Sequence, residues 1–112
     1  MVVIHHTASD VTMEKEIIST KRHRGKVPYH YLIWKNGEIV QTRSLKDSPG
    51  ATLNWEANKY WIQIALIGNF NNTEPTQTQK ESLQKLIRKF NLPIKLHRDV
   101  WQTACPWKYF SF

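Results

Sequence analysis

An almost uninterrupted apolar run from Trp61 to Ile67 constrains the fold of this 112-residue chain more than any other feature. Gly68 and Asn69 end the run. It is far too short to cross a membrane, since a membrane helix needs about 20 apolar residues. A strand with one exposed face alternates apolar and polar residues, whereas a strand buried on both faces is continuously apolar. We therefore expect a central strand that is covered on both of its faces.

Further strands are expected on either side of this run in the sequence. Val2–Ile4 is short and β-branched, and Ile94–Leu96 is a short segment near the end of the chain. Tyr29–Trp34 and Glu38–Thr42 flank Asn36-Gly37, the strongest short hairpin signal, because both of its residues tolerate positive φ. The sequence thus predicts two short strands near its ends and a hairpin between them.

Two helices are expected between these strands. Ser9 and Asp10 are the expected N-caps of a helix over about residues 12–23. The thin apolar face of that helix consists of Met13, Ile17 and Ile18. Thr76 and Gln79 form a capping box before a second helix, which ends at Pro93. Its apolar stripe, at helical spacing, consists of Leu83, Leu86, Ile87 and Phe90. Because helices and strands alternate without a linker, we predict one α/β domain over residues 1–112, with a mixed central sheet flanked by helices.

The charge of the chain limits its partners only broadly. Net charge is +7, with sixteen Lys and Arg against nine Asp and Glu. A basic surface attracts polyanions, so nucleic acid, anionic lipid and an anionic cell wall all qualify, and a solvated surface explains the charge equally well. Met1 to His6 lack the ordered segments of a secretory signal. We therefore expect a chain that starts in the cytoplasm, or one from which a leader has been removed.

Three residues far apart in the sequence could form a metal site. His5 and His97 follow the expected first and last strands, and Cys105, the single cysteine, comes shortly after His97. If these strands are neighbours, both imidazoles and the thiolate would converge at one sheet edge. These ligands suit zinc, and three of them with an open fourth position describe a catalytic site. The alternative is structural: His5 caps a strand, His97 forms a surface hydrogen bond and Cys105 fills core space.

Five sequence blocks occur in an order that resembles a known family. They are Ile4-His-His-Thr-Ala-Ser9, Pro28-Tyr-His-Tyr-Leu-Ile33 with Asn36-Gly-Glu-Ile39, Ile64-Ala-Leu-Ile-Gly-Asn-Phe70, Pro75-Thr76 with Gln79, and His97-Arg-Asp-Val100 with Thr103-Ala-Cys-Pro106. Together they resemble the type 2 N-acetylmuramoyl-L-alanine amidases, a family that includes phage lysozyme-like amidases and peptidoglycan recognition proteins. The resemblance extends from residue 3 to about residue 110. It implies a mixed central sheet flanked by helices, which agrees with the fold predicted above from the strand and helix patterns.

The resemblance also implies the ligands of one zinc ion, Zn2+. They are His5, His97 and Cys105, in a cleft at one edge of the sheet. His6 would then point the other way, since successive side chains of a strand alternate faces. His6 as the ligand is the alternative register.

Two further site residues follow from the resemblance. Tyr29 matches a family tyrosine that lines the zinc cleft, and Thr103 matches a position held by Lys or Thr in related enzymes. Zinc would activate a water molecule, and the two hydroxyls would stabilise the oxyanion or relay a proton to the leaving amine. Some relatives carry a catalytic Glu in the central strand, but this chain has Ala65 there. Proton transfer is therefore expected to rest on zinc-bound water, Tyr29 and Thr103.

Three other positions depart from the family pattern. Thr52 stands in place of a frequent His, and Trp107 in place of the usual Gly after Cys-Pro. The sequence stops at Phe112, where relatives often continue into a helix. We expect the apolar surface left near Phe112 to invite a partner or a dimer.

The expected function is hydrolysis of the amide bond between the lactyl group of N-acetylmuramic acid and L-alanine of the stem peptide. This would be an endolysin-like, antibacterial cell-wall hydrolase, made in the cytoplasm and acting on the wall after release, or extracellular if a leader was removed. Its partner would be peptidoglycan or a muropeptide, with no nucleic acid and no stable membrane insertion. The first alternative is a non-catalytic peptidoglycan-binding module on the same fold. The second is a basic nucleic-acid binder, for which the sequence holds no recognisable module. The oligomeric state stays open.

Overall fold

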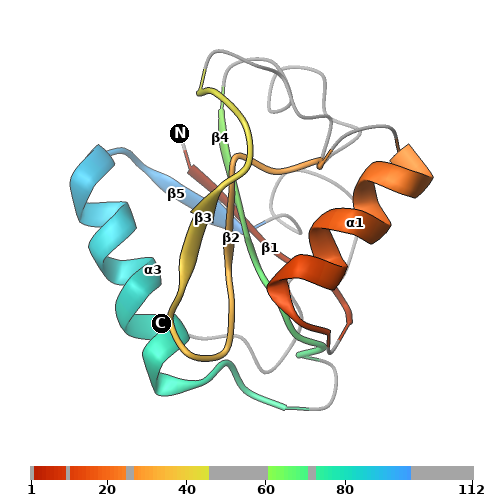
Figure 1. Cartoon of the computed structure of the whole chain (residues 1–112). Helices are drawn as coiled ribbons and strands as arrows, with labels where there is room; N and C mark the ends of the chain where they lie inside the picture. The colour runs from red at the N-terminus through yellow and green to blue at the C-terminus, as the bar shows by residue number, and fades with distance from the viewer. Residues whose placement is uncertain (1, 10, 25–26, 46–60, 71–72, 97–112) are drawn as a thin grey trace.

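The computed structural model describes residues 2–9, 11–24, 27–45, 61–70 and 73–96. Within these residues one sheet has the strand order β3-β2-β4-β1-β5 (Figure 1). Its strands are β1 (Val2–His6), β2 (Tyr31–Ile33), β3 (Ile39–Gln41), β4 (Ile62–Leu66) and β5 (Ile94–Leu96). Only the β2–β3 pair among these is antiparallel; β2–β4, β4–β1 and β1–β5 are parallel. The sheet is therefore mixed, as predicted, and the expected first and last strands are neighbours.

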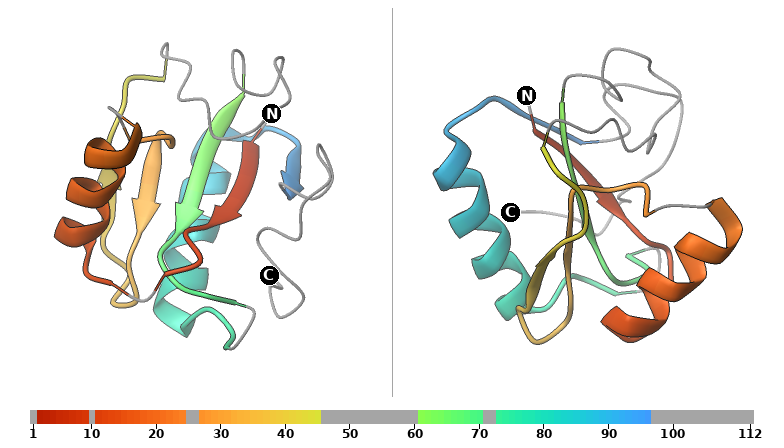
Figure 2. Two further views of the ribbon diagram at one scale, coloured as in Figure 1. Left: turned by 90° about the vertical axis from the view of Figure 1, so that its right-hand side faces the viewer. Right: turned by 45° about the horizontal axis from the view of Figure 1, so that its top comes forward.

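The central strand β4 is covered on both faces. Helix α1 (Met13–Arg24) lies on one side of the sheet and helix α3 (Gln77–Phe90) on the other (Figure 1 and Figure 2). Every residue of β4 from Gln63 to Leu66 is buried. The apolar run thus predicted the middle of the sheet correctly.

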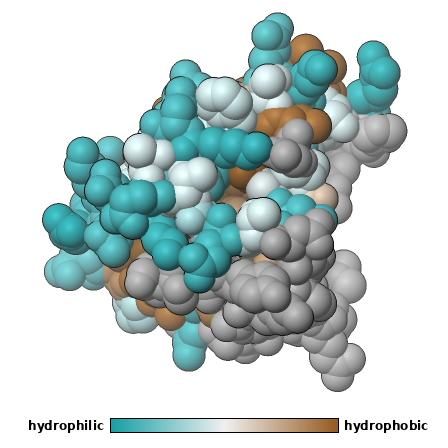
Figure 3. Space-filling model, turned by 90° about the horizontal axis from the view of Figure 1, so that it is seen from below, coloured by the Kyte–Doolittle hydropathy of each residue, from teal (hydrophilic) through white to brown (hydrophobic). Residues whose placement is uncertain are grey.

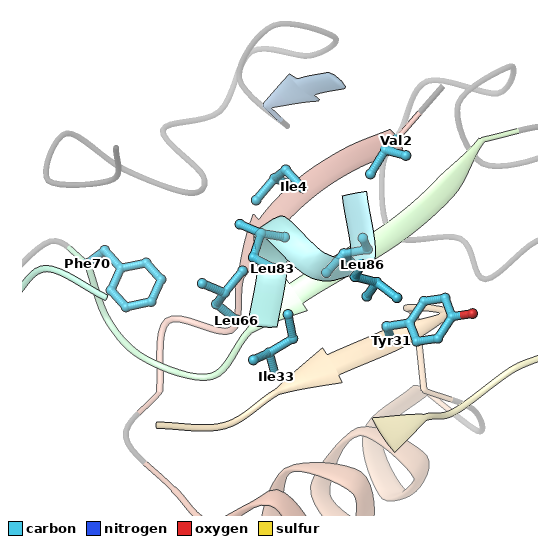
Figure 4. Close-up of a cluster of buried hydrophobic side chains, with 9 residues drawn as sticks. Val2, Ile4, Tyr31, Ile33, Leu66, Phe70, Leu83 and Leu86 are labelled. Carbon is cyan, nitrogen blue, oxygen red and sulfur yellow. The ribbon is translucent and has the colours of Figure 1, made fainter. Parts of the chain in front are cut away.

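The α3 face of the sheet carries one apolar core cluster (Figure 4). Alternate residues of the inner strands, among them Ile4, Ile33 and Ile64, pack with Leu83 and Leu86 of α3. Burial of one such side chain contributes about 1.5–3 kcal/mol. The rest of the predicted stripe, Ile87 and Phe90, is partly buried against the same cluster. The helical stripe is therefore confirmed.

A second apolar cluster lies on the opposite face, towards α1. It joins Met13 and, half-buried, Ile17 of the helix to Leu32, Ala65 and other residues. Ile18, expected on the inner side of the helix, is 51% exposed instead. It follows Met13 by five residues, which places it about 140° around the helix axis from Met13.

The cap of α1 also differs from the prediction. The Thr12 hydroxyl accepts a hydrogen bond from the backbone N–H of Lys15 at 3.2 Å, which is the geometry of an N-cap. The Ser9 hydroxyl instead donates to the Glu16 carboxylate at 3.0 Å. Asp10, the other expected cap, lies outside the described residues.

The β2–β3 hairpin forms where Asn36-Gly37 predicted it. The Gly37 N–H donates to the Trp34 carbonyl at 2.9 Å, and the Trp34 N–H donates to the Glu38 carbonyl at 3.0 Å. Gly37 has φ of +89°, which favours glycine. These bonds place Trp34 in the turn, and β2 is shorter than the predicted Tyr29–Trp34 at both ends, since it begins at Tyr31 and ends at Ile33.

The capping box of α3 is confirmed, and one of its residues does more than cap. Gln79 donates its N–H to the Thr76 hydroxyl, and its Oε1 accepts from the Thr76 N–H, both at 3.1 Å. Its Nε2 donates to the carbonyls of Ile33 at 3.1 Å and Ile67 at 2.9 Å. A single buried side chain therefore joins the start of α3 to the ends of β2 and β4.

One face of the described surface is mainly polar. Seen from below, hydrophilic side chains dominate and small apolar patches lie between them (Figure 3). Of the helices in the described ranges, none has the length and apolar content needed to cross a bilayer.

Candidate active site

His5 is buried near the carboxyl end of β1, with 1% of its surface exposed. Its ring lies beside that of Tyr29, with ring centroids 5.2 Å apart and planes tilted by 54°. Tyr29 in turn packs against the apolar cluster on the α1 face. The expected ligand and the expected catalytic tyrosine therefore come together on this face of the sheet.

His6 points to the opposite face. Its ring lies 5.7 Å from that of Phe70, a member of the α3-face core, and its Nδ1 accepts the Phe70 N–H at 3.3 Å. The alternation expected from a strand thus separates the two histidines. Only His5 shares a face with Tyr29.

Gln63 contacts the His5 ring directly. The Gln63 side-chain oxygen Oε1 lies 2.6 Å from His5 Nε2, and both residues are buried. An amide oxygen accepts but does not donate, so Nε2 carries the proton in this bond. In the neutral ring the lone pair that can bind a metal then belongs to Nδ1.

Sequence reasoning missed this role of Gln63. The signal was present, because Gln63 is the one polar side chain within the Trp61–Ile67 run. A buried amide in an otherwise apolar strand needs a partner. The identity of that partner, however, depends on the pairing of β4 with β1.

His30 holds the backbone of Gln63 from the other side. His30 Nδ1 accepts the Gln63 N–H at 2.9 Å, and the His30 N–H donates to the Gln63 carbonyl at 2.8 Å. His30 is 1% exposed. Its side chain therefore has a structural role, since it holds the backbone of β4.

The backbone of Tyr29 is anchored to the end of the hairpin. The Thr42 hydroxyl donates to the Tyr29 carbonyl at 2.7 Å, and the Thr42 N–H donates to the neighbouring His30 carbonyl at 2.8 Å. These bonds fix the segment that enters β2 relative to β3. They hold the Tyr29 ring next to His5.

The turn that follows His6 is joined to both β4 and α1. The Gly68 N–H donates to the Thr7 hydroxyl at 3.2 Å, and the Ser9 hydroxyl donates to the Thr7 hydroxyl and to the Glu16 carboxylate, each at 3.0 Å. Glu16 is only 6% exposed. The Thr and Ser of the His-His-Thr-Ala-Ser block thus hold the end of β1 in place.

Ala65 lies directly beside His5 in the sheet. The β1–β4 register pairs His5 with Ala65, and the β2–β4 register pairs Ala65 with Leu32. Ala65 is fully buried in the apolar cluster on the α1 face. This chain therefore presents a methyl group next to His5.

The other expected site residues, His97, Thr103 and Cys105, lie outside the described residues, as do Thr52 and Trp107. Within the described ranges, no three His, Cys, Asp or Glu side chains gather as a metal site would require. The strand β5 nevertheless pairs Ile4 with Leu96, the residues that immediately precede His5 and His97. The strands that lead to these two histidines are therefore in register.

A family model decides the relationship of the chain to known proteins. The model described as N-acetylmuramoyl-L-alanine amidase (Amidase_2) matches residues 1–108. The chain belongs to this amidase family. A comparison with curated protein sequences finds no match.

Solved structures with the same fold include amidases and peptidoglycan recognition proteins. The N-acetylmuramoyl-L-alanine amidase LysC from Clostridium intestinale URNW is 33% identical, with a TM-score of 0.79, over 98% of this chain and 77% of that one. PGRP-SA from Apis mellifera is 23% identical, with a TM-score of 0.85, over 97% and 76% of the two chains. Peptidoglycan recognition protein-LE, solved with tracheal cytotoxin, is 22% identical, with a TM-score of 0.81, over 95% and 72%. The family match and the 33% identical amidase thus show the family, and the two recognition proteins show the shared fold.

Proposed function

We propose that this chain is a zinc-dependent N-acetylmuramoyl-L-alanine amidase in which His5, His97 and Cys105 hold the metal. The observation that carries the proposal is the family match over residues 1–108, joined to the buried pair of His5 and Tyr29. The family description and the name of the 33% identical amidase supply the bond to be cut, between N-acetylmuramic acid and L-alanine.

The described residues fit a zinc site in two respects. Metal-binding histidines usually donate their second ring N–H to an acceptor, and His5 donates Nε2–H to the Gln63 oxygen at 2.6 Å. The parallel pairing of β5 with β1 brings the chain just before His97 alongside the chain just before His5. Both features support a metal held between the ends of β1 and β5.

The residues of this chain would divide the work as follows. Zinc, when bound, would act as a Lewis acid that polarises the scissile carbonyl and lowers the pKa of the attacking water molecule. The Tyr29 ring packs against His5, so we propose that its phenol donates a hydrogen bond to the developing oxyanion of the substrate. Ala65 stands in place of a carboxylate, so the Tyr29 and Thr103 hydroxyls would relay the proton that the attacking water loses to the leaving amine.

The substrate would be a muropeptide or intact peptidoglycan. Recognition protein-LE, which has the same fold, was solved with monomeric diaminopimelic acid-type peptidoglycan. The net charge of +7 would favour approach to an anionic wall. Both observations support peptidoglycan as the partner.

The experiment compares substitutions of His5 and His6, which are adjacent in the sequence but face opposite sides of the sheet. Purified His5→Ala and His6→Ala variants would be compared with the unaltered chain for zinc content and for release of L-alanine peptides from purified cell walls. We expect His5→Ala to lose zinc and activity by more than the ten- to hundredfold that loss of an outer partner costs. His6→Ala should keep its zinc. Equal zinc in both variants would rule out His5 as a ligand.

A second comparison addresses the part of the site that lies outside the described residues. Cys105→Ser should bind less zinc than the unaltered chain, because a hydroxyl is a poorer zinc ligand than a thiolate. Equal zinc content would show that Cys105 is not a ligand. If zinc and muropeptide bind tightly but no amide is cleaved, the chain is a peptidoglycan-binding module, which is the alternative function.

A further inference from the structure

We infer that Gln63 is a positioning residue for His5, which fixes the ring as the Nε2–H tautomer and so presents Nδ1 as the metal-binding nitrogen. The inference rests on the proposed zinc function. It concerns a residue that neither the sequence blocks nor the family match assigns to the site.

The side-chain amide of Gln63 is in direct contact with the His5 ring. Gln63 Oε1 and His5 Nε2 are 2.6 Å apart, and the two residues are 0% and 1% exposed. Water therefore does not compete for either atom, and a buried hydrogen bond of this kind holds both groups in one orientation. Rotation of the imidazole would break the bond and leave buried polar atoms to be satisfied elsewhere.

The backbone of Gln63 lies between two neighbouring strands that hold it in place. In the sheet Gln63 pairs with Val3 of β1, two residues before His5. On the other side, its N–H and carbonyl are both bonded to His30, at 2.9 and 2.8 Å. An acceptor oxygen on so fixed a backbone can position a ligand, which is what a metal site requires of its supporting residues.

Ala65 is the next residue of β4 on the same face as Gln63. Side chains at alternate positions of a strand share a face, so Gln63 and Ala65 both lie on the side of His5. Ala65 is directly beside His5 in the register but has no polar atom in its side chain. The one polar side chain that β4 offers on this face from Gln63 to Ala65 is therefore the amide that contacts the imidazole.

A second buried glutamine shows what a purely structural role looks like. The Gln79 amide is 1% exposed and bonds only to backbone groups in the contacts given above, namely those of Ile33, Ile67 and Thr76. Gln79 lies on α3, away from the His5 face. It is thus a matched control: same residue type, same burial, different partner.

The experiment compares three variants of the full chain. Gln63→Met removes the acceptor, Gln63→Glu keeps an acceptor oxygen, and Gln79→Met removes the structural glutamine. Zinc affinity is measured by competition with a chromogenic chelator. We expect Gln63→Met to weaken zinc binding by about ten- to a hundredfold. Gln63→Glu should restore it, and Gln79→Met should lower thermal stability while leaving zinc affinity within about twofold of the unaltered chain.

The tautomer of His5 gives a readout that loss of stability would not change. Long-range proton–nitrogen NMR correlations in the zinc-loaded, unaltered protein should show the His5 proton on Nε2 and the metal on Nδ1. This measurement decides the question even if Gln63→Met does not fold. A proton on Nδ1 would overturn the inference.

The outcomes separate this inference from the function on which it rests. If the unaltered chain binds no zinc, both fail. If it binds zinc and Gln63→Met binds zinc equally well, the zinc amidase proposal stands and the positioning role of Gln63 is wrong. A loss of affinity in Gln63→Met that exceeds the loss in Gln79→Met supports the inference.

Discussion

Gln79→Ala should destabilise the domain far more than a surface substitution in the same turn of α3. Gln79 makes three hydrogen bonds through its side chain, with the Ile33 carbonyl, the Ile67 carbonyl and the Thr76 N–H. Each contributes a net of about 0.5–1.5 kcal/mol, so their loss costs about 3 kcal/mol. A buried carbonyl that loses its hydrogen bond also carries a desolvation cost. The Ile33 carbonyl still accepts the Ile67 N–H at 2.9 Å, so this cost arises mainly at the Ile67 carbonyl. The total is about 3–4 kcal/mol.

This cost corresponds to a large shift in melting temperature. Unfolding entropy scales with length, and for 112 residues it is about 0.24 kcal/mol per degree, which predicts a drop of about 12–17 °C. The assay is guanidinium denaturation followed by tryptophan fluorescence, together with calorimetry, both with a chelator present so that zinc binding does not contribute. The control is Gln77→Ala, since Gln77 is exposed and its amide reaches only Glu81, at 3.4 Å. A difference between the two variants below about 0.5 kcal/mol would refute the reasoning.

Three further predictions address the site, the hairpin and the core. Tyr29→Phe keeps the ring beside His5 but removes the phenol, so cell-wall hydrolysis should fall by about a hundredfold with zinc affinity unchanged, and equal turnover would exclude the phenol from the reaction. Gly37→Ala places a Cβ 3.2 Å from the Thr78 carbonyl at a φ of +89°, and should lower the free energy of unfolding by more than about 1 kcal/mol in denaturant titrations. Burial raises the pKa of Tyr31 above its ordinary value, so its contribution to stability is complete below the unfolded pKa of about 10 and is lost as pH rises through the folded pKa. Tyr31→Phe should therefore flatten the decline in the free energy of unfolding above about pH 10, as measured by denaturant titrations. An unchanged decline would show that the ionisation of Tyr31 does not cause it.

Much of the fold could be predicted because its signals are local. The capping box, the Asn-Gly turn and the spacing of Leu83 and Leu86 all act within a few residues, and the structure confirms each of them. The apolar run predicted β4 because burial on both faces leaves no alternation. The misassignment of Ile18 has an equally local reason: Ile17 and Ile18 are about 100° apart around the helix axis, and the sequence alone does not say which of them lies closer to the sheet.

For the candidate site, the family resemblance supplied His5 and Tyr29, and strand alternation supplied the opposite orientation of His6. Alternation separates His5 from His6, and the structure places them on opposite faces. The bond from Gln63 to His5 joins residues 58 positions apart, and its existence depends on the register of two parallel strands. No local pattern specifies that register. The assignments of His97, Thr103 and Cys105 stay predictions, since these residues lie outside the described ranges.

The place of β1 in the sheet has a consequence for how the domain is made. The first strand of the chain pairs with residues 62–66 and 94–96, strands that leave the ribosome much later. Pairings so distant in sequence close slowly, because loop entropy is lost before the contacts form. During synthesis β1 therefore has neither of its strand partners until β4 has emerged, and its second partner, β5, follows only after α3. The contact of His5 with Gln63 can form only after β4 has been made, so this part of the candidate site cannot be complete early in synthesis.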